Sequence, residues 1–168
     1  MQALKILTLP DPFLKKKLLY VVKVDDRIRA IAASMTEVML QNTRCVGLAA
    51  SQLGIDLRIV VVDASLGAKK HPNHGRLTLI NPVITGSAGR QMFREGCLSV
   101  PDFTGNVFRA EEITVEYRDL EGNKASLSTN GFESVLIQHE IDHLDGILFL
   151  DRVGSLKTDV FRRKQICK

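Results

Sequence analysis

Residues 130–146, NGFESVLIQHEIDHLDG, are the most informative part of this chain. Apolar side chains recur through the stretch at the spacing of one helix face. Asn130 with Glu133 three residues later is the arrangement of a capping box, and Gly146 stands where a glycine ends a helix in a left-handed cap. The stretch therefore predicts a capped, amphipathic helix.

Inside this predicted helix lies an H-E-x-x-H sequence formed by His139, Glu140 and His143. Residues four apart are neighbours on a helix surface, so the two imidazoles can reach one metal ion. Glu140 lies between them, where its carboxylate can act on water without being a ligand. The alternative is an exposed charged helix with Glu140 and Asp142 facing solvent, which suits an amphipathic helix less well. The pattern indicates a metal-dependent hydrolase.

Such a site needs a third protein ligand, because catalytic zinc-type centres use three and keep one position for water. Downstream of His143 there is no histidine, and the carboxylates are Asp145, Asp151 and Asp159. Upstream, Cys97 stands in a segment that bends at Pro101. Taken alone, Cys97 fits a small buried thiol at least as well as a ligand. The residues by themselves leave this choice open.

The remaining pattern predicts strands grouped around that one helix. The expected elements are a helix over 26–42 capped by Asp25, a buried strand over 58–63, a surface loop over 67–76, a strand over 77–84 interrupted by Pro82, a hairpin of 112–117 with 125–127, and a final helix from Ser155 to Lys168. Because helices and strands do not alternate strictly, we expect an α+β fold. It would have antiparallel β-sheets packed around the central metal-binding helix, a C-terminal helix, and a single catalytic domain over 1–168.

Composition narrows the class of protein. The net charge of +4 is too small to argue for nucleic-acid binding. The cysteines, Cys45, Cys97 and Cys167, are odd in number and far apart, unlike a disulfide framework. We expect a cytoplasmic protein, because the N-terminus resembles no signal peptide and no apolar run approaches the roughly 20 residues that cross a bilayer. We expect no membrane partner.

Three motifs together resemble those of the peptide deformylases. The chain has CVGLAASQ at 45–52, EGCLS at 95–99 and QHEIDH at 138–143, where the family has G-x-G-L-A-A-x-Q, E-G-C-L-S and Q-H-E-x-D-H. The resemblance covers nearly the whole chain and implies a metal-dependent hydrolase of bacterial type. Its implied substrates are N-formylmethionyl peptides, from which it would remove the formyl group during protein synthesis.

The resemblance also implies a role for each matching residue. Cys97, His139 and His143 would be the metal ligands, and Glu140 the general acid/base. Gln52 and the backbone N–H of Leu98 would stabilise the tetrahedral intermediate. The implied cofactor is one divalent ion per chain, natively Fe²⁺, with Zn²⁺ or Ni²⁺ as substitutes.

An apolar stripe on the predicted helix points to the substrate pocket. Phe132, Val135 and Leu136 continue the helix face that carries His139 and His143, and the simpler interpretation is ordinary core. The resemblance implies that substrate binding involves the residues of this stripe together with Val46, Gly47, Phe93 and Gly96. It further implies the ribosome, near its exit tunnel, as a partner of the basic cluster Arg162-Arg163-Lys164, although a solvated helix face explains that cluster equally well.

One motif departs from the family pattern. Cys45 replaces the usual first glycine, and Thr43-Arg44 precede it where the family often has acidic residues. We expect Cys45 to avoid a positive φ and to line the mouth of the cleft, where it would affect peptide preference. Two rival functions are a lapsed deformylase-like binding protein and an H-E-x-x-H endopeptidase. Amine release from formyl-Met-Ala, tested beside an unformylated peptide, separates these functions from deformylation and from each other.

Overall fold

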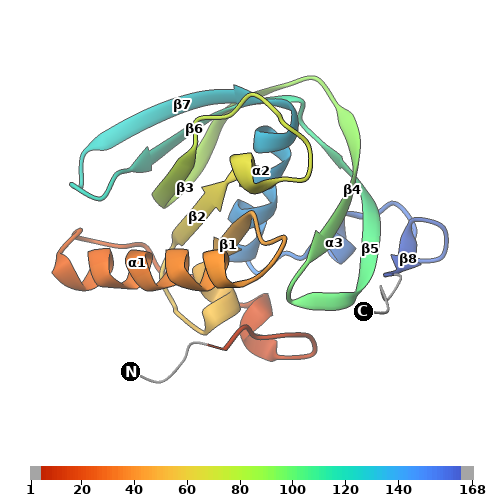
Figure 1. Cartoon of the computed structure of the whole chain (residues 1–168), viewed down its shortest axis with the longest axis horizontal. Coiled ribbons are helices and arrows are strands. Elements are labelled where there is room, and N and C mark those ends of the chain that lie inside the picture. The colour runs from red at the N-terminus through yellow and green to blue at the C-terminus, as the bar shows by residue number, and fades with distance from the viewer. Residues whose placement is uncertain (1–4, 164–168) are drawn as a thin grey trace.

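The computed structural model describes residues 5–163, in which two antiparallel sheets flank a central helix, α2 (Gly131–Leu144) (Figure 1). The five-stranded sheet has the order β1 (Gly47–Ala49), β2 (Ile59–Asp63), β3 (Arg76–Ala88), β6 (Glu112–Arg118), β7 (Lys124–Asn130). The three-stranded sheet has the order β4 (Gln91–Cys97), β5 (Val100–Arg109), β8 (Val160–Arg162). The other helices are α1 (Asp26–Gln41), α3 (Phe149–Arg152) and the 3₁₀ helices η1 (Pro12–Lys15), η2 (Ala50–Leu53) and η3 (Ala64–Leu66). The expected α+β class is confirmed.

Helix α1 begins as its sequence predicts. The Asp25 side chain accepts a hydrogen bond from the N–H of Ile28 at 3.0 Å, which satisfies one of the free donors of the first turn. One face of the helix is buried, through Ile28, Ala32, Met35 and Met39. This face packs against β1 and β2, and β2 is apolar except for Asp63 at its end. The apolar face of the helix is therefore buried against an apolar strand.

Strand β3 is longer than expected. It runs for 13 residues, and Pro82 lies inside it rather than ending it. The pairing of β3 with β6 shifts register between Ile80 and Val83, and Asn81 in this interval has φ 53°. Because the ladder is broken there, the missing N–H of Pro82 removes no sheet hydrogen bond. The expected β6–β7 hairpin is confirmed, with Arg118 opposite Lys124.

The two ends of α2 differ from one another in how well they were predicted. At the C-terminal end, Gly146 has φ 71° and the N–H of Ile147 bonds to the carbonyl of Asp142 at 2.9 Å, so the left-handed cap is confirmed. At the N-terminal end the capping box is wrong, because the side chain of Asn130 makes no capping bond. The fully buried carboxylate of Glu133 instead accepts hydrogen bonds from Thr129 and from His74 of the 67–75 loop.

The last helix also lies elsewhere than expected. The C-terminal helix is α3, four residues long, and it ends before Ser155. From Ser155 onward the chain forms a turn and then β8, which pairs Phe161 with Thr104 on the open edge of β5. That pairing satisfies backbone groups that an isolated short helix would leave exposed. Residues 164–168, including Lys164 of the basic cluster, lie outside the described part.

The strands β4 and β5 were not expected from the sequence. They form the second wall of the molecule, at the right of Figure 1, and enclose a small second core that includes Cys97, Val107 and Phe149. The larger core lies between α1, the five-stranded sheet and α2. Helix α2 is therefore buried on several sides, and 11 of its 14 residues are buried. No helix in the described range is long and apolar enough to span a membrane.

Candidate metal centre and its cleft

Helix α2 brings the two histidines of the H-E-x-x-H sequence together. His139 and His143 are one turn apart, and their ring centroids are separated by 5.1 Å. Both side chains are buried, with relative exposures of 8% and 1%. The rings therefore meet inside the molecule, and the interpretation of an exposed charged helix is wrong.

Cys97 comes from the three-stranded sheet. It ends β4, and its Sγ atom lies 3.2 Å from Nε2 of His143. The chain then turns, and the N–H of Ser99 donates to the same sulfur at 3.4 Å. Ligand atoms of Cys97, His139 and His143 all lie within 4.8 Å of one another, and they form a cluster with metal-ligand spacing in the described part of the chain.

The chemistry of these donors fits a divalent transition metal. Burial would raise the pKa of the Cys97 thiol, but the charge of His143 and hydrogen bonds from both imidazoles outweigh it and hold that pKa well below its ordinary value. The thiolate is the form that binds metals. One thiolate and two imidazoles suit zinc, iron or nickel better than magnesium or calcium, which prefer oxygen donors.

Glu95 orients one of the imidazoles. Its Oε2 atom lies 2.7 Å from Nδ1 of His139, which leaves Nε2 of that ring for the metal side. Arg109 donates to both oxygens of Glu95, at 2.7 and 2.9 Å. Burial would raise the pKa of Glu95, but the hydrogen bonds from Arg109 and His139 lower it to about 2. The carboxylate is therefore held ionised and fixed. Sequence reasoning missed this role, although Glu95 and Cys97 stand two apart in one strand and so share a face.

A chain of buried charges continues behind Glu95. The guanidinium of Arg109 also contacts Asp142, whose carboxylate accepts two bonds from Arg152 at 2.6 and 3.0 Å. Asp142 is only 7% exposed, so it does not face solvent. Each buried charge in this chain has an opposite partner, which is the condition for tolerating it inside a protein.

Glu140 lines the cleft beside Cys97 and His139. Its side chain is buried, and its Oε2 atom has no hydrogen-bond partner in the described structure. Burial is the main cause that raises the pKa of Glu140 to about 7. A side chain at Gly47 would place its Cβ 2.6 Å from Oε1, so it would displace the Glu140 carboxyl group. A buried, unpartnered carboxyl with this pKa is suited to accept and return a proton near neutral pH.

Gln52 stands beside the cysteine. Its Oε1 atom accepts from the N–H of Ala49 at 2.9 Å, which fixes the amide orientation. Its Nε2 atom donates to Cys97 Sγ at 3.3 Å and to Ser99 Oγ at 3.1 Å. The Gln52 donor therefore points at the metal cluster, and Leu98, half-buried, lines the cleft next to it.

A cleft of about 420 Å³ connects these groups to the surface. It is lined by all but one of the residues that the sequence predicted for the site: Val46, Gly47, Gln52, Phe93, Gly96, Cys97, Leu98, Phe132, Val135, Leu136, His139 and Glu140. The exception, His143, lies deeper, against Cys97. The ring centroids of Phe93, on β4, and Phe132, on α2, are 5.7 Å apart. The ring of His71, from the 67–75 loop, packs in a tilted arrangement 5.0 Å from that of Phe132. Apolar and reactive groups thus share one cavity.

Cys45 also lines this cleft. The positive φ in its neighbourhood belongs to Arg44, at 69°, and Cys45 is not among the described residues with positive φ, as predicted. Its thiol donates to the carbonyl of Gly47 at 3.2 Å. Burial, followed by the charge of Glu140, raises the pKa of Cys45 to about 12, so this thiol stays protonated and unreactive.

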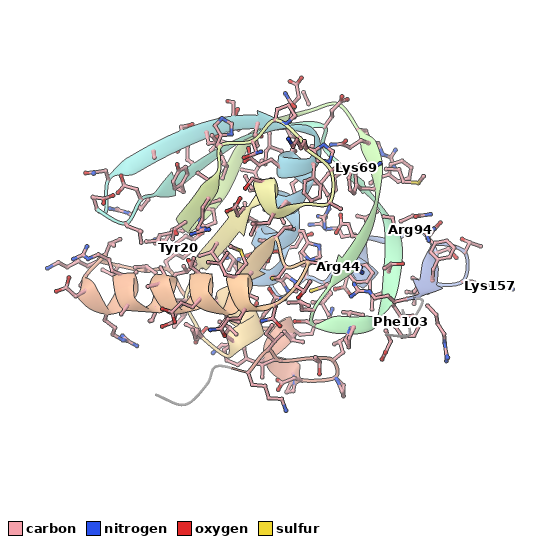
Figure 2. All side chains as sticks on the ribbon, viewed as in Figure 1. Tyr20, Arg44, Lys69, Arg94, Phe103 and Lys157 are labelled. Carbon is pink, nitrogen blue, oxygen red and sulfur yellow. The ribbon has the colours of Figure 1, made fainter. Side chains whose placement is uncertain are left out.

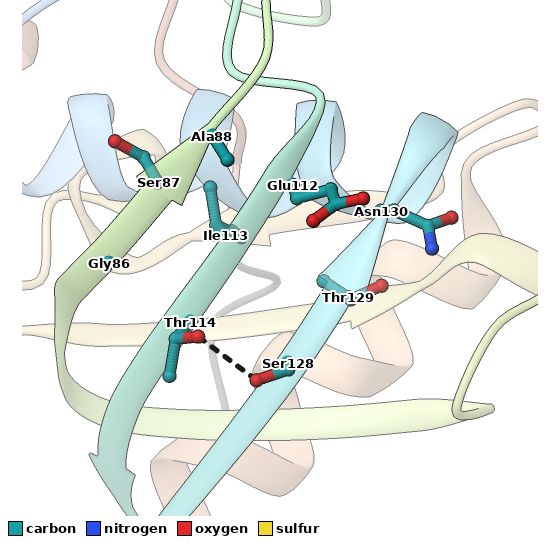
Figure 3. Close-up of a pocket in the computed structure, with 9 residues that line it drawn as sticks. All are labelled: Gly86, Ser87, Ala88, Glu112, Ile113, Thr114, Ser128, Thr129 and Asn130. Atoms are coloured by element: carbon teal, nitrogen blue, oxygen red, sulfur yellow. Dashed lines mark hydrogen bonds between the residues drawn. The ribbon is translucent and has the colours of Figure 1, made fainter.

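A second hollow, of about 340 Å³, lies over strands β3, β6 and β7 (Figure 3). Small and polar side chains line it, and the hydroxyls of Thr114 and Ser128 share a hydrogen bond of 3.0 Å. Glu112 is its one ionisable residue, and it has no cysteine or histidine. Its lining therefore lacks the groups for metal or nucleophilic chemistry, and the chemistry belongs to the cleft beside α2.

Comparison with known proteins gives a consistent result. A sequence model described as polypeptide deformylase matches residues 3–159. A peptide deformylase of Nitrosococcus oceani is 44% identical over 98% of this chain and 95% of its own length. A peptide deformylase of Thermodesulfovibrio yellowstonii is 39% identical over 98% of this chain and 97% of its own length.

Solved structures agree. A peptide deformylase from Legionella pneumophila superposes with a TM-score of 0.82 at 38% identity, over 91% of this chain and 87% of that one. A peptide deformylase from Synechococcus elongatus, in complex with actinonin, superposes with a TM-score of 0.84 at 36% identity, over 94% of this chain and 84% of that one.

Proposed function

We propose, from the premise that this chain belongs to the polypeptide deformylase family, that Cys97, His139 and His143 hold one divalent metal ion and that Glu140 is the general acid/base. The protein is a peptide deformylase, a hydrolase that removes the formyl group from the N-terminus of nascent polypeptides, and its family is metal-dependent. The observation that carries the residue assignment is the convergence of the three ligand atoms within 4.8 Å at the base of the cleft.

The chain's own residues divide the work of the reaction. A bound divalent ion supplies Lewis-acid polarisation of a carbonyl and makes water a better nucleophile near neutral pH. Glu140 takes a proton from the attacking water and delivers one to the departing amine nitrogen, so that the products are formate and a free amino terminus. Gln52 and the N–H of Leu98 donate to the oxygen that gains charge during the attack.

The apolar part of the cleft would hold the methionine side chain. Its walls are Val46, Phe93, Phe132, Val135 and Leu136. A flexible thioether adapts well to such an irregular apolar wall. Gly47 leaves room for Glu140, with which a side chain there would collide, and Gly96 leaves room for the guanidinium of Arg163.

The decisive test of function is formate and amine release from formyl-Met-Ala, with unformylated Met-Ala-Ser as the second substrate. We expect turnover of the first peptide and none of the second. Binding of the formyl peptide without turnover would favour the lapsed enzyme, and cleavage of the peptide bond in the second would favour an endopeptidase.

For the ion, we propose Fe²⁺ as the native metal, with Zn²⁺ or Ni²⁺ as substitutes. Affinity alone favours zinc over iron at nearly any site of this kind, so supply and geometry must select iron. Elemental analysis of protein purified without oxygen or added metal tests this, and zinc as the dominant ion would contradict it.

We further propose a single catalytic domain over 1–168, a cytoplasmic location, and the ribosome near its exit tunnel as a partner, because formylated chains emerge there. The basic residues Arg162 and Arg163 lie at and just after β8 and not on a helix. They therefore support ribosome contact by charge alone. Co-sedimentation with ribosomes at low and high salt tests this proposal.

A further inference from the structure

Three arginines line the cleft, and we refer to them as the arginine rim. Arg44 lies just before β1, Arg94 lies on β4, and Arg163 follows β8. All three line the same cavity as Glu140 and His139. Figure 2 labels Arg44 beside the chain that leads into β1 and Arg94 beside β4, so two of these cations come from different sheets.

Two of these cations are held in place. The guanidinium of Arg94 stacks on the ring of Phe161 at 3.6 Å, and its Nε donates to Asn106 at 3.2 Å. The backbone N–H of Arg163 donates to the carbonyl of Asp102 at 2.7 Å, and its guanidinium occupies the space that a side chain at Gly96 would need. Stacking and close packing restrict these side chains, so less conformational entropy is lost when they bind an anion.

The charge of this arginine rim is not neutralised by the cleft itself. The carboxylates that line the cleft are Glu95 and Glu140, and both are buried. Glu95 is already paired with Arg109 in the interior. Within residues 5–163, none of the three rim arginines forms an ion pair. The mouth of the cleft therefore presents net positive charge to whatever enters it.

We infer that this arginine rim selects formyl peptides that carry a carboxylate side chain shortly after the formylmethionine. The inference rests on the proposed function, because Glu140 and the metal ligands fix the formyl end of the substrate at the base of the cleft. An extended peptide advances about 3.3 Å per residue, so the residues that follow formylmethionine lie along the cleft that the rim lines. β1 and β4 are edge strands of their sheets, which leaves both walls open to an extended chain.

A peptide is the occupant because the arginines belong to the walls of the reactive cavity. Aspartate and glutamate match the planar, two-pronged donor geometry of a guanidinium. Lysine or arginine in the same substrate positions would meet like charge. The rim is exposed, so its effect is electrostatic selection that salt weakens.

The experiment compares three C-terminally amidated peptides, formyl-Met-Ala-Glu, formyl-Met-Ala-Gln and formyl-Met-Ala-Lys, by formate release. Amidation leaves the glutamate side chain as the one carboxylate. We expect kcat/KM for the Glu peptide to exceed that for the Lys peptide by at least ~5-fold at low ionic strength, with the ratio falling toward one in high salt. The free-acid form of the Gln peptide shows how far a terminal carboxylate substitutes for the side chain.

Variants locate the effect. Arg44→Gln and Arg94→Gln should each lower the Glu/Lys ratio by roughly 2-fold, the effect of one exposed charge pair. Arg90→Gln is the matched control: its guanidinium also stacks on a phenyl ring, that of Phe108 at 4.0 Å, but it does not line the cleft. It makes the same change in net charge and should leave the ratio unchanged.

The outcomes separate this inference from the proposed function. Equal rates for the Glu and Lys peptides, or an equal effect of Arg90→Gln, would overturn the role of the rim while leaving deformylation intact. Absence of formate release from all three peptides would overturn the proposed function and this inference with it.

Discussion

Oε2 of Glu95 lies 2.7 Å from Nδ1 of His139, so a carboxylate from strand β4 sets the orientation of an imidazole on helix α2. The contact joins the three-stranded sheet to the central helix at the proposed metal centre. Because Arg109 donates to both oxygens of the same carboxylate, the imidazole is fixed by interactions that reach through the core.

Glu95→Gln should weaken metal retention without removing a ligand. The amide keeps the size of the side chain but loses the charge that favours a proton on Nδ1 and a free Nε2. We expect metal affinity to fall by ~10- to 100-fold, the usual effect of losing such a partner. Competition with a chromogenic chelator measures it, with Glu112→Gln in the distant hollow as the control. Unchanged affinity would mean that the position of His139 does not depend on Glu95.

The ligand set predicts how metal content responds to substitution. Wild-type protein should retain about one ion per chain, and His139→Ala or His143→Ala should retain almost none, because three protein ligands are needed. Elemental analysis after extensive dialysis measures this. Full metal content in either variant would remove that histidine from the ligand set.

Glu140→Gln tests the acid/base assignment separately. The amide has nearly the same shape but cannot accept the proton, so kcat should fall by at least ~100-fold while metal content stays near that of the wild type. Formate release and elemental analysis on the same preparation measure both quantities. A variant that keeps its activity would show that another group moves the proton.

The apolar cleft predicts preference for methionine. Formyl-Met-Ala should be a much better substrate than formyl-Gly-Ala or formyl-Asp-Ala, because Val135 and its neighbours offer no polar partner. Val135→Thr, which keeps the shape but adds a hydroxyl, should narrow the difference between the Met and Asp substrates. Equal kcat/KM for formyl-Met and formyl-Asp peptides in the wild type would contradict the pocket.

Cys45→Gly should change peptide preference and not the catalytic step. Cys45 needs no positive φ, so glycine relieves no strain there, and it only widens the cleft where the thiol stood. We expect kcat/KM to change to different extents for formyl peptides that differ after methionine. A rise in kcat of at least ~10-fold on every substrate, equal to about 1.4 kcal/mol of barrier, would instead mean that the thiol obstructs the chemistry.

Local sequence patterns were sufficient to predict the position of an element wherever its own residues show a clear apolar periodicity. Helix α1, the buried strand β2, the β6–β7 hairpin and the C-terminal end of α2 lie where they were predicted. The capping box failed because Thr129 and His74 compete for the Glu133 carboxylate. The final helix failed because the open edge of β5 pairs with the chain from Val160 onward. Strands β4 and β5 were missed because polar and glycine residues obscure their alternation.

In the candidate site, too, local sequence predicted some features and tertiary packing alone decided others. The sequence by itself determined that His139, Glu140 and His143 share one region of a helix, because a spacing of four residues fixes their relative positions through local hydrogen bonds. The sequence indicated Cys97 as the third metal ligand only through the resemblance of its motif to that of the family. Tertiary structure alone decided that the Cys97 sulfur lies 3.2 Å from His143 and that Glu95 and Arg109 support His139. It also decided that arginines from separate parts of the chain line one cleft. These residues are far apart along the chain. They come together because β4 and β5 pack with α3 around the small core, while α2 packs on the five-stranded sheet in the larger core.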